Sequence, residues 1–178
     1  MSDAPVLIIV IGLPGTGKTT FSRHLAQRLS ARHLNTDIIR DAVDMRGQYD
    51  PEAKKRIYDL MLLEARRALL SGQKVILDGT FYREPLRESY RQLSFAHRIP
   101  LRWIELKASE EVIAQRTTRK RTYSEADFSI YQQVRDKFEP FTDDRLVLQS
   151  DDPEALPNML NEAEAYIINP AGSSRSPS

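Results

Sequence analysis

The chain contains no cysteine among its 178 residues. This absence excludes disulfide bonds, thiolate nucleophiles and zinc sites with thiolate ligands. The chain has only three histidines, His24, His33 and His97, and their spacing is not that of metal ligands, so we assign them to surface or core packing. No Ser-His-Asp arrangement is indicated either. The sequence therefore offers none of the common cysteine-, zinc- or serine-based sites.

A strong net charge and a membrane-spanning apolar run are also missing. The 26 basic and 25 acidic residues leave a net charge of +1, which gives no global argument for binding nucleic acid or a membrane. The apolar run at residues 6–11 is far too short to span a bilayer, and it lacks the flanks of a signal peptide. We expect a cytoplasmic protein with no membrane partner, in which any basic binding surface is local.

Length and composition indicate one domain. A chain of 178 residues, 40% hydrophobic and 29% charged, suits a single domain with a sizeable core. Only the C-terminal stretch lacks an apolar period and is rich in helix breakers. We expect a domain over residues 1–168 and a flexible tail over residues 169–178.

Residues 12–19 read Gly-Leu-Pro-Gly-Thr-Gly-Lys-Thr, a complete G-x-x-x-x-G-K-[ST] phosphate-binding loop. The loop follows the apolar run and precedes an amphipathic pattern, so the required strand, glycine turn and helix start are all present. Glycines let backbone N–H groups point at phosphate oxygens, and the helix start adds its dipole. We predict that the loop binds a nucleoside triphosphate through Gly12, Leu13, Pro14, Gly15, Thr16, Gly17, Lys18, Thr19 and Thr20.

Two side chains of this loop have specific expected roles. Lys18 is expected to reach the β- and γ-phosphates and to take part in catalysis. The Thr19 hydroxyl can complete a Mg²⁺ shell. An ordinary turn between a strand and a helix is the alternative, and the complete motif in its proper context disfavours it.

Apolar runs alternate with amphipathic patterns along the rest of the chain. Strands are expected at 6–11, 33–36, 74–78, 101–106 and 145–149, and helices at 18–32, 38–45, 51–71, 84–97, 110–121, 124–138 and 153–168. This alternation predicts an α/β fold in which helices cover both faces of a parallel sheet, a three-layer sandwich. Ligands of such sheets gather outside the carboxyl ends of the strands.

Two acidic residues stand at such strand ends. Asp78 ends the run Lys74-Val75-Ile76-Leu77-Asp78, where an acid can hold Mg²⁺. An N-cap-like turn residue is the alternative, and the nearby phosphate loop favours the metal role. Asp37 follows the second strand and is a candidate base for an acceptor hydroxyl.

Arg40 lies one helical turn after Asp37 and can bind an anionic group of an acceptor. In the alternative interpretation Asp37 caps a short helix and Arg40 pairs with Asp44. Position after the second strand favours the functional role.

Further cations follow these two strand ends. Arg83 and Arg87 come just after Asp78 and either contact an acceptor or pair with Glu84 and Glu88.

Residues 116–121 carry four cations in the segment Arg-Thr-Thr-Arg-Lys-Arg. Arg116 is the first candidate for stabilising the transferred phosphoryl group, followed by Arg119 and Lys120 as nucleotide contacts on a lid. A solvated helix face is the alternative for this run.

Four stretches together resemble a known group of enzymes: GLPGTGKTTFSRHLAQRL, the Asp-x-x-Arg at 37–40, KVILDGTFYREPLR and IAQRTTRKR. They are similar to the small P-loop kinases related to polynucleotide 5′-kinases, a group that includes zeta-toxin-like, gluconate and chloramphenicol kinases. Most similar in pattern are stand-alone bacterial ATP-binding proteins called predicted kinases. The resemblance covers about residues 5–168.

The resemblance implies a five-stranded parallel sheet in the order 2-3-1-4-5, with the phosphate-loop strand central and a small helical lid. It also implies ATP and Mg²⁺, Asp37 as general base, Arg40 as acceptor contact and lid arginines near the triphosphate. The lid departs from the pattern of polynucleotide kinases, because the residue four after Arg116 is Lys120 rather than arginine. Lysine cannot form a bidentate guanidinium contact.

These features predict an ATP-dependent phosphotransferase that moves the γ-phosphate to a hydroxyl acceptor, either a nucleotide or a 5′-hydroxyl polynucleotide. Two alternatives remain: a kinase of a sugar or antibiotic-like alcohol, and a non-catalytic ATP-binding switch. A motor of the AAA type is disfavoured, since the chain is short for the extra helical subdomain of such motors. The sequence identifies neither the acceptor nor the oligomeric state.

Overall fold

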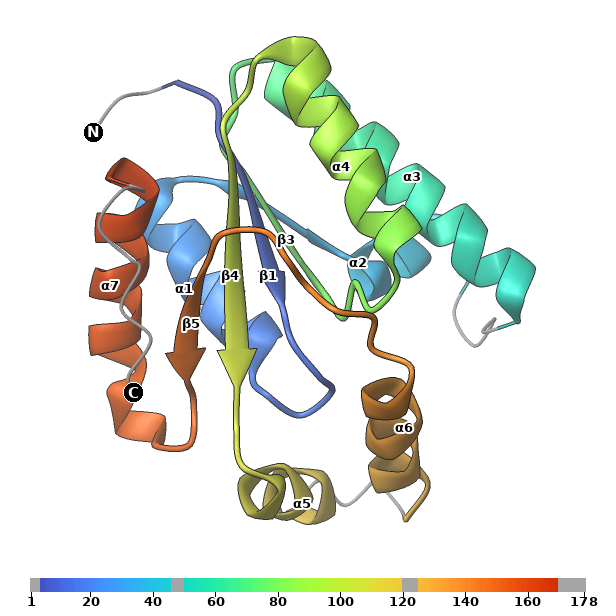
Figure 1. Cartoon of the computed structure of the whole chain (residues 1–178). Helices are drawn as coiled ribbons and strands as arrows, with labels where there is room; N and C mark the ends of the chain where they lie inside the picture. The colour runs from blue at the N-terminus through green and yellow to red at the C-terminus, as the bar shows by residue number, and fades with distance from the viewer. Residues whose placement is uncertain (1–3, 46–49, 120–124, 170–178) are drawn as a thin grey trace.

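A sheet of five parallel strands forms the centre of the computed structural model (Figure 1). The structure describes residues 4–45, 50–119 and 125–169. The strands are β1 (Leu7–Ile11), β2 (Arg32–Asn35), β3 (Val75–Gly79), β4 (Leu101–Lys107) and β5 (Arg145–Gln149). They pair in the order β2-β3-β1-β4-β5, and every pair is parallel. The expected strand order, with the phosphate-loop strand in the centre, is confirmed.

Seven α-helices surround the sheet in the described part of the chain. They are α1 (Lys18–Leu29), α2 (Thr36–Ala42), α3 (Pro51–Leu70), α4 (Glu84–His97), α5 (Glu110–Arg119), α6 (Glu125–Asp136) and α7 (Leu156–Ile168), with a short 3₁₀ turn at Pro153–Ala155 before α7. Helices α1 and α7 cover one face, whereas α3 and α4 cover the other (Figure 1). The three-layer α/β sandwich is therefore confirmed. None of the described helices is long and apolar enough to cross a bilayer.

Two apolar layers hold the helices on the sheet. All five residues of β1 are buried, as expected for a central strand that is covered on both faces. Side chains alternate along it: Ile8 packs in the layer with Phe21 of α1, and Ile9 packs in the opposite layer with Ile57 of α3. This packing fixes β1 and therefore fixes the loop that leaves its carboxyl end.

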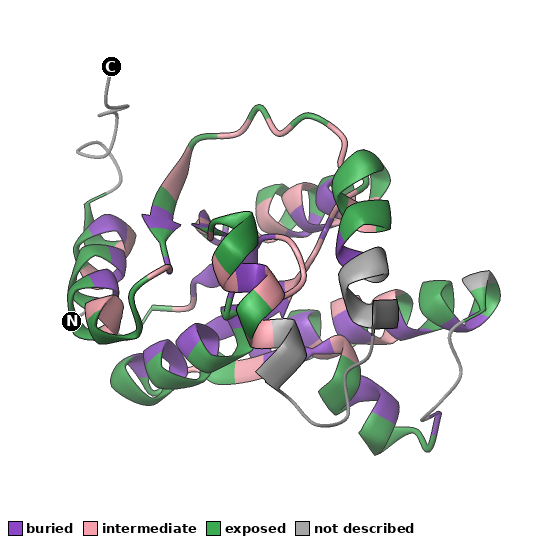
Figure 2. Cartoon of the chain, turned by 90° about the horizontal axis from the view of Figure 1, so that it is seen from below, coloured by how far each residue is buried: buried purple, intermediate pink, exposed green. Residues whose placement is uncertain are grey.

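The carboxyl ends of the strands meet at the lower edge of the sheet in Figure 1. The loop between β1 and α1 lies there, and α5 and α6 project beyond it as the expected small helical lid. Figure 2 looks onto this edge, where the described part of α5 carries exposed residues. Residues 170–178 lie outside the described part, so the division into a domain and a tail stays a prediction.

Candidate active site

The loop from Gly12 to Gly17 joins the buried strand β1 to helix α1. Gly12 has φ +152°, and a Cβ on it would lie 2.5 Å from the Leu106 carbonyl oxygen, so no larger residue fits. Gly17 adopts a left-handed conformation, φ +84°, at the N-cap of α1, where it provides no capping side chain. The first N–H groups of α1 are thus left without a side-chain cap, which is the arrangement that binds a phosphate.

Lys18 is buried at the start of α1, with 9% of its surface exposed. Its Nζ donates a hydrogen bond to the Leu13 carbonyl oxygen at 2.8 Å, so the side chain folds back over the loop. Burial lowers the pKa of Lys18 from 10.5 to about 8, and attraction to Asp78 partly offsets this shift. The ammonium lies in a low-dielectric loop, where a phosphate would favour its charged form.

Thr19 and Asp78 bring two oxygen groups together next to Lys18. The Thr19 hydroxyl donates to Asp78 Oδ1 at 3.0 Å, across the gap between α1 and the end of β3. The second carboxylate oxygen, Oδ2, accepts a short hydrogen bond from His33 Nε2 and another from Asn35 Nδ2 at 3.3 Å. A hydroxyl and a buried carboxylate beside a phosphate loop are hard oxygen donors that fit Mg²⁺.

No group of three His, Cys, Asp or Glu side chains within the described ranges could hold a metal by itself. This agrees with the habit of Mg²⁺, which binds through one or two protein oxygens and completes its shell with phosphates and water. The fit therefore depends on the nucleotide being bound at the same time.

Asp37 and Arg40 lie on α2, which begins directly after β2. The Asn35 side chain accepts a hydrogen bond from Ile38 N at 2.8 Å, so Asn35, rather than Asp37, is the N-cap of this helix. The Asp37 side chain is 81% exposed, and its Oδ1 lies 3.2 Å from Nη1 of the buried Arg40. Asp37 is thus not the N-cap of α2, and its carboxylate is exposed to solvent.

Arg116 of α5 reaches back to the phosphate-binding loop. Its Nη1 donates to the Gly15 carbonyl oxygen at 3.2 Å and to Ser150 Oγ at 3.3 Å, while Nη2 donates to the Ser150 carbonyl oxygen. The Arg119 side chain is not among the described ones, and Lys120 lies outside the described residues. Of the three predicted lid cations, Arg116 is therefore the one whose contact with the loop can be stated.

The prediction that Arg87 binds an acceptor disagrees with its position in the structure. Arg87 is fully buried in α4 and serves the fold. Its guanidinium donates to three backbone carbonyls, those of Phe81 (2.7 Å), Pro140 (2.7 Å) and Glu139 (2.8 Å). It also lies over the rings of Phe138 and Phe141. Arg83, in contrast, is exposed at the N-cap of α4 and stays a predicted acceptor contact.

The comparisons with known proteins agree with this geometry. The domain family described as AAA domain (AAA_33) matches residues 7–141, which is more than half of the chain. The chain belongs to this family of P-loop kinase domains.

Two relatives and one solved structure illustrate the likeness. An uncharacterized protein of Mycobacterium tuberculosis is 31% identical over 122 residues, covering 62% of this chain and 24% of the relative. An adenylate kinase of Vanderwaltozyma polyspora is 29% identical over 174 residues, covering 88% of this chain and 78% of that enzyme. A crystal structure of a candidate kinase from Chloroflexus aurantiacus has a TM-score of 0.70 at 26% identity, covering 91% and 98% of the two chains. The chain thus spans about a quarter of the length of the first of these relatives.

Sequence reasoning missed several residues of this P-loop kinase site. His33 was assigned to packing, yet it contacts Asp78. The available signal was the alternation along β2, since Asn35 pairs in register with Asp78 and His33 lies two residues before it on the same face. Ser150 was also missed: its hydroxyl donates to the Thr16 carbonyl oxygen at 2.7 Å and so joins the end of β5 to the loop.

Tyr58 of α3 is a further missed residue, on the side of the acceptor candidates. Its hydroxyl lies near Thr80 and within electrostatic range of Arg40 and Asp78. Burial is the main cause that raises the pKa of Tyr58, so the phenol stays neutral. Its ring packs edge-on against Phe81, with the ring centroids 5.9 Å apart. The side chain therefore adds a neutral hydroxyl to the region between α2 and the end of β3.

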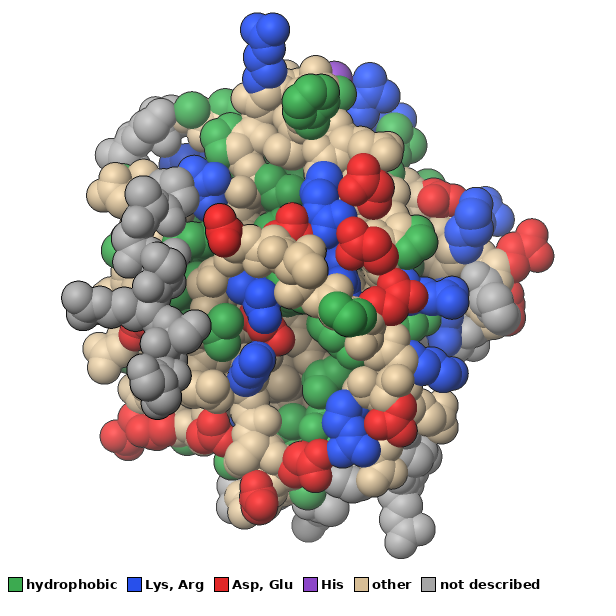
Figure 3. All heavy atoms as spheres, in the orientation of Figure 1, with side chains coloured by type: hydrophobic (Ala, Val, Ile, Leu, Met, Phe, Trp, Pro, Cys, Tyr) green, Lys and Arg blue, Asp and Glu red, His purple; other side chains and the backbone are tan. Residues whose placement is uncertain are grey.

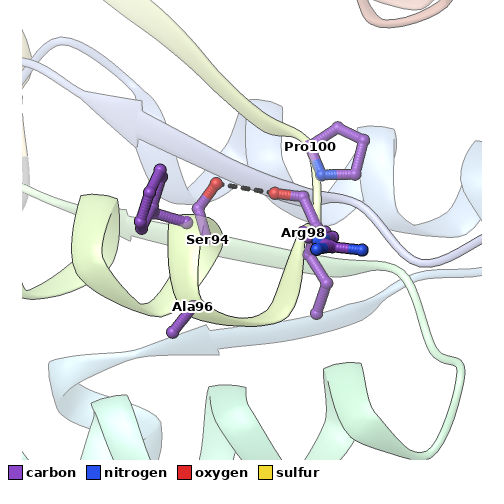
Figure 4. A pocket seen from close by; sticks show the side chains of 6 residues that line it. Ser94, Ala96, Arg98 and Pro100 are labelled. Atoms are coloured by element: carbon purple, nitrogen blue, oxygen red, sulfur yellow. Dashed lines mark hydrogen bonds between the residues drawn. The ribbon is translucent and has the colours of Figure 1, made fainter.

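Two hollows differ in their relation to the site. A cavity of about 270 Å³ lies beside the phosphate loop, lined among others by Leu13, Ile113 and Phe138. A more open hollow of about 760 Å³ lies at the C-terminal end of α4, around Ser94 and Arg98 (Figure 4). The second is at the amino ends of the strands, the opposite edge from the loop, so the larger hollow is separate from the kinase site.

Proposed function

We propose that this chain is an ATP-dependent phosphotransferase that moves the γ-phosphate to a hydroxyl group of an acceptor bearing an anionic group. The observation that carries the proposal is the contact between Thr19 and Asp78 beside the buried Lys18. This contact brings the phosphate-binding loop, the proposed metal-binding pair and the Lys18 ammonium together at the carboxyl ends of the strands. A second strand end supplies Asp37 and Arg40 next to them.

The nucleotide half of the proposal uses residues 12–20. Backbone N–H groups of the loop and of the start of α1 would bind the phosphates, and Lys18 would reach the β- and γ-phosphates. Thr19 and Asp78 would hold Mg²⁺, which when bound neutralises charge on the phosphate oxygens. The loop glycines support this assignment, because a Cβ at Gly12 would collide with the Leu106 carbonyl.

The acceptor half of the proposal uses α2. Asp37 would accept the proton of the acceptor hydroxyl and orient its oxygen toward the γ-phosphate. Its 81% exposure and its contact with Arg40 support a carboxylate that is accessible and already oriented. Arg40 would bind an anionic group of the acceptor, with Arg83 at the start of α4 as a second contact.

The anionic acceptor we favour is a nucleotide or a 5′-hydroxyl strand, with a phosphorylated sugar as the smaller alternative. The outer surface gives little support to a long nucleic-acid track. On the face seen in Figure 3, basic side chains lie among acidic ones. Arg91, for example, forms ion pairs with Glu84, Glu88 and Asp143. This mixture favours recognition by a local cationic site over recognition by an extended basic stripe.

Helices α5 and α6 lie beyond the carboxyl ends of the strands, on the side of the phosphate loop (Figure 1). We propose that Arg116, assisted by Arg119 and Lys120, stabilises charge on the transferred phosphoryl group and excludes water. The hydrogen bond from Arg116 to the Gly15 carbonyl oxygen supports a position within reach of the phosphates.

A transfer assay tests the proposal directly. The purified chain is incubated with Mg²⁺ and γ-labelled ATP against a panel of nucleotides, 5′-hydroxyl oligonucleotides, sugars, sugar phosphates and antibiotics. We expect label on one class of anionic acceptor with the wild type and essentially none with Lys18→Ala. Release of inorganic phosphate alone, with no acceptor labelled above the Lys18→Ala background, would contradict phosphotransfer.

A further inference from the structure

Both carboxylate oxygens of Asp78 are engaged, and each faces a different part of the molecule. Oδ1 accepts the hydrogen bond from Thr19, on the side of the phosphate loop. Oδ2 points the other way and accepts from His33 Nε2 and Asn35 Nδ2. Two donors of β2 therefore hold the carboxylate through Oδ2, while Oδ1 faces the Thr19 hydroxyl, the other member of the proposed metal-binding pair.

The sheet itself places these donors. Asn35 is the register partner of Asp78 in the parallel pair of β2 and β3, and His33 pairs with Ile76, two residues earlier on each strand. The two donors consequently lie on the same face of the sheet as Asp78. The His33 and Asp78 side chains are 13% and 5% exposed, so little water can replace a lost donor.

Lys18 gives the orientation of Asp78 a direct consequence. The two charges attract each other across the site. Without its hydrogen bonds to β2, the Asp78 carboxylate could turn toward the Lys18 ammonium. In such an ion pair, Asp78 would no longer be available to the metal, and Lys18 would no longer be available to the phosphates. The two hydrogen bonds at Oδ2 oppose such a rotation.

We propose that His33 is a positioning residue for the metal site, acting through Asp78. This inference rests on the proposed metal pair of Thr19 and Asp78. The role requires of His33 one donor, the N–H of Nε2, placed against Asp78 Oδ2. Asn35 also donates to Asp78, but its Oδ1 caps α2, so a change of Asn35 would disturb the helix as well. A change of His33 therefore tests the orientation of Asp78 alone.

Two variants of His33 that differ in the position of the donor facing Asp78 test the positioning role. In His33→Gln the side-chain amide nitrogen takes about the place of Nε2, whereas in His33→Asn the amide is shorter by one methylene and falls short of Asp78. Both side chains are neutral and polar, so the pair differs mainly in reach. His97→Asn, at the C-terminal end of α4, is the control for a histidine distant from the site.

The measurement is the affinity of Mn²⁺ for the protein–ADP complex, followed by electron paramagnetic resonance, together with the affinity of ADP in EDTA. We expect His33→Asn to weaken Mn²⁺ binding about 10-fold or more, the usual scale for a lost partner of a metal ligand, with metal-free ADP affinity unchanged. His33→Gln should bind Mn²⁺ within about 3-fold of the wild type, and His97→Asn should match the wild type.

Equal Mn²⁺ affinity in His33→Asn and His33→Gln would overturn the inference. A parallel loss of Mn²⁺ affinity and of metal-free ADP affinity would also overturn it, since this would be the sign of a role in packing alone. The Mn²⁺ titration needs no phosphoryl transfer. An absence of turnover in the wild type would therefore contradict the proposed function without deciding the role of His33.

Discussion

At the scale of single residues, the burial of Lys18 predicts that nucleotide binding depends on pH. Its pKa in the folded protein is about 8, lower than the ordinary 10.5, because the ammonium is buried. A bound phosphate favours the charged form, so binding and protonation are coupled. Above pH 8 the unliganded protein loses this proton, and binding must restore it.

We therefore predict that the affinity for ADP is constant below about pH 7.5 and falls as the pH rises through about 8 toward 9.5. Isothermal titration calorimetry in EDTA, in two buffers of different ionisation enthalpy, would also detect proton uptake in that window. Lys18→Ala should bind weakly at every pH and lose the dependence. Wild-type affinity that stays flat over this range would disprove the coupling.

Arg40 is the residue on which acceptor recognition depends in this account. Arg40→Ala should raise the KM for the acceptor more than the KM for ATP, with a loss on the order of 1.5–3 kcal/mol for contacts to a charged group. The exposed Arg56→Ala on α3 is the matched control and should leave both constants unchanged. An unaltered acceptor KM in Arg40→Ala, or a preferred acceptor without an anionic group, would show the assignment to be wrong.

The salt dependence of acceptor binding separates two kinds of anionic acceptor. A polynucleotide that makes several backbone contacts releases several counterions, so its binding weakens steeply with salt. A small phosphorylated acceptor should show a shallower dependence. This comparison needs only the wild-type protein.

At the scale of elements, Arg87 connects the start of α4 by hydrogen bonds to the segment that follows α6. Its three carbonyl partners are Phe81, in the loop before α4, and Glu139 and Pro140, in the segment after α6, and the side chain has no exposed surface. Arg87→Lys cannot reproduce this forked contact and would leave buried carbonyls without donors.

We predict that Arg87→Lys lowers the free energy of unfolding by about 2–4 kcal/mol, measured by urea denaturation. Arg83→Lys, an exposed change four residues earlier, should alter stability by less than about 0.5 kcal/mol. If Arg87→Lys unfolded like the wild type and raised the acceptor KM instead, the acceptor role predicted from sequence would be right after all.

Most elements could be predicted from the sequence because their apolar periods are local signals. The run at 6–11 indicated β1, and the pattern after Lys18 indicated α1. The boundary of α2 was less accurate: the helix begins at Thr36 rather than near residue 38, since Asn35 provides the cap. A cap and the end of a strand use the same polar residue types, so the sequence alone did not distinguish them.

Contacts between distant segments could not be predicted in the same way. The burial of Arg87 depends on carbonyls more than 50 residues later, at Glu139 and Pro140. The contact of His33 with Asp78 depends on the strand register. The burial of Arg87 leaves no periodic trace in the chain, and the alternation along β2 places His33 on a face of the sheet without identifying its partner. The phosphate loop was predictable because its own local geometry requires the glycines.

At the scale of the whole molecule, a ligand that binds only the folded state stabilises it by mass action. With Mg²⁺–ATP at about 100 times its Kd, the gain is about 2.7 kcal/mol. For a chain of 178 residues this corresponds to a rise in Tm of about 5–10 °C.

Differential scanning calorimetry over a nucleotide series should show this rise for the wild type, and Lys18→Ala should lose most of it. The matched control is the exposed Lys55→Ala, which should keep the full rise. A wild-type Tm that is unaffected by millimolar Mg²⁺–ATP would contradict nucleotide binding at the loop.

Whole-molecule function depends on whether the loop and α2 act on the same reaction, and one measurement tests this most directly. Under single-turnover conditions, the label of γ-labelled ATP is followed onto the acceptor found in the transfer panel, for the wild type and for Asp37→Asn. We predict that Asp37→Asn slows transfer by about 10²–10⁴-fold, the scale of a positioned base, while its ATP affinity remains near that of the wild type. Transfer by Asp37→Asn at the wild-type rate would contradict the account, because α2 would then have no part in the chemistry.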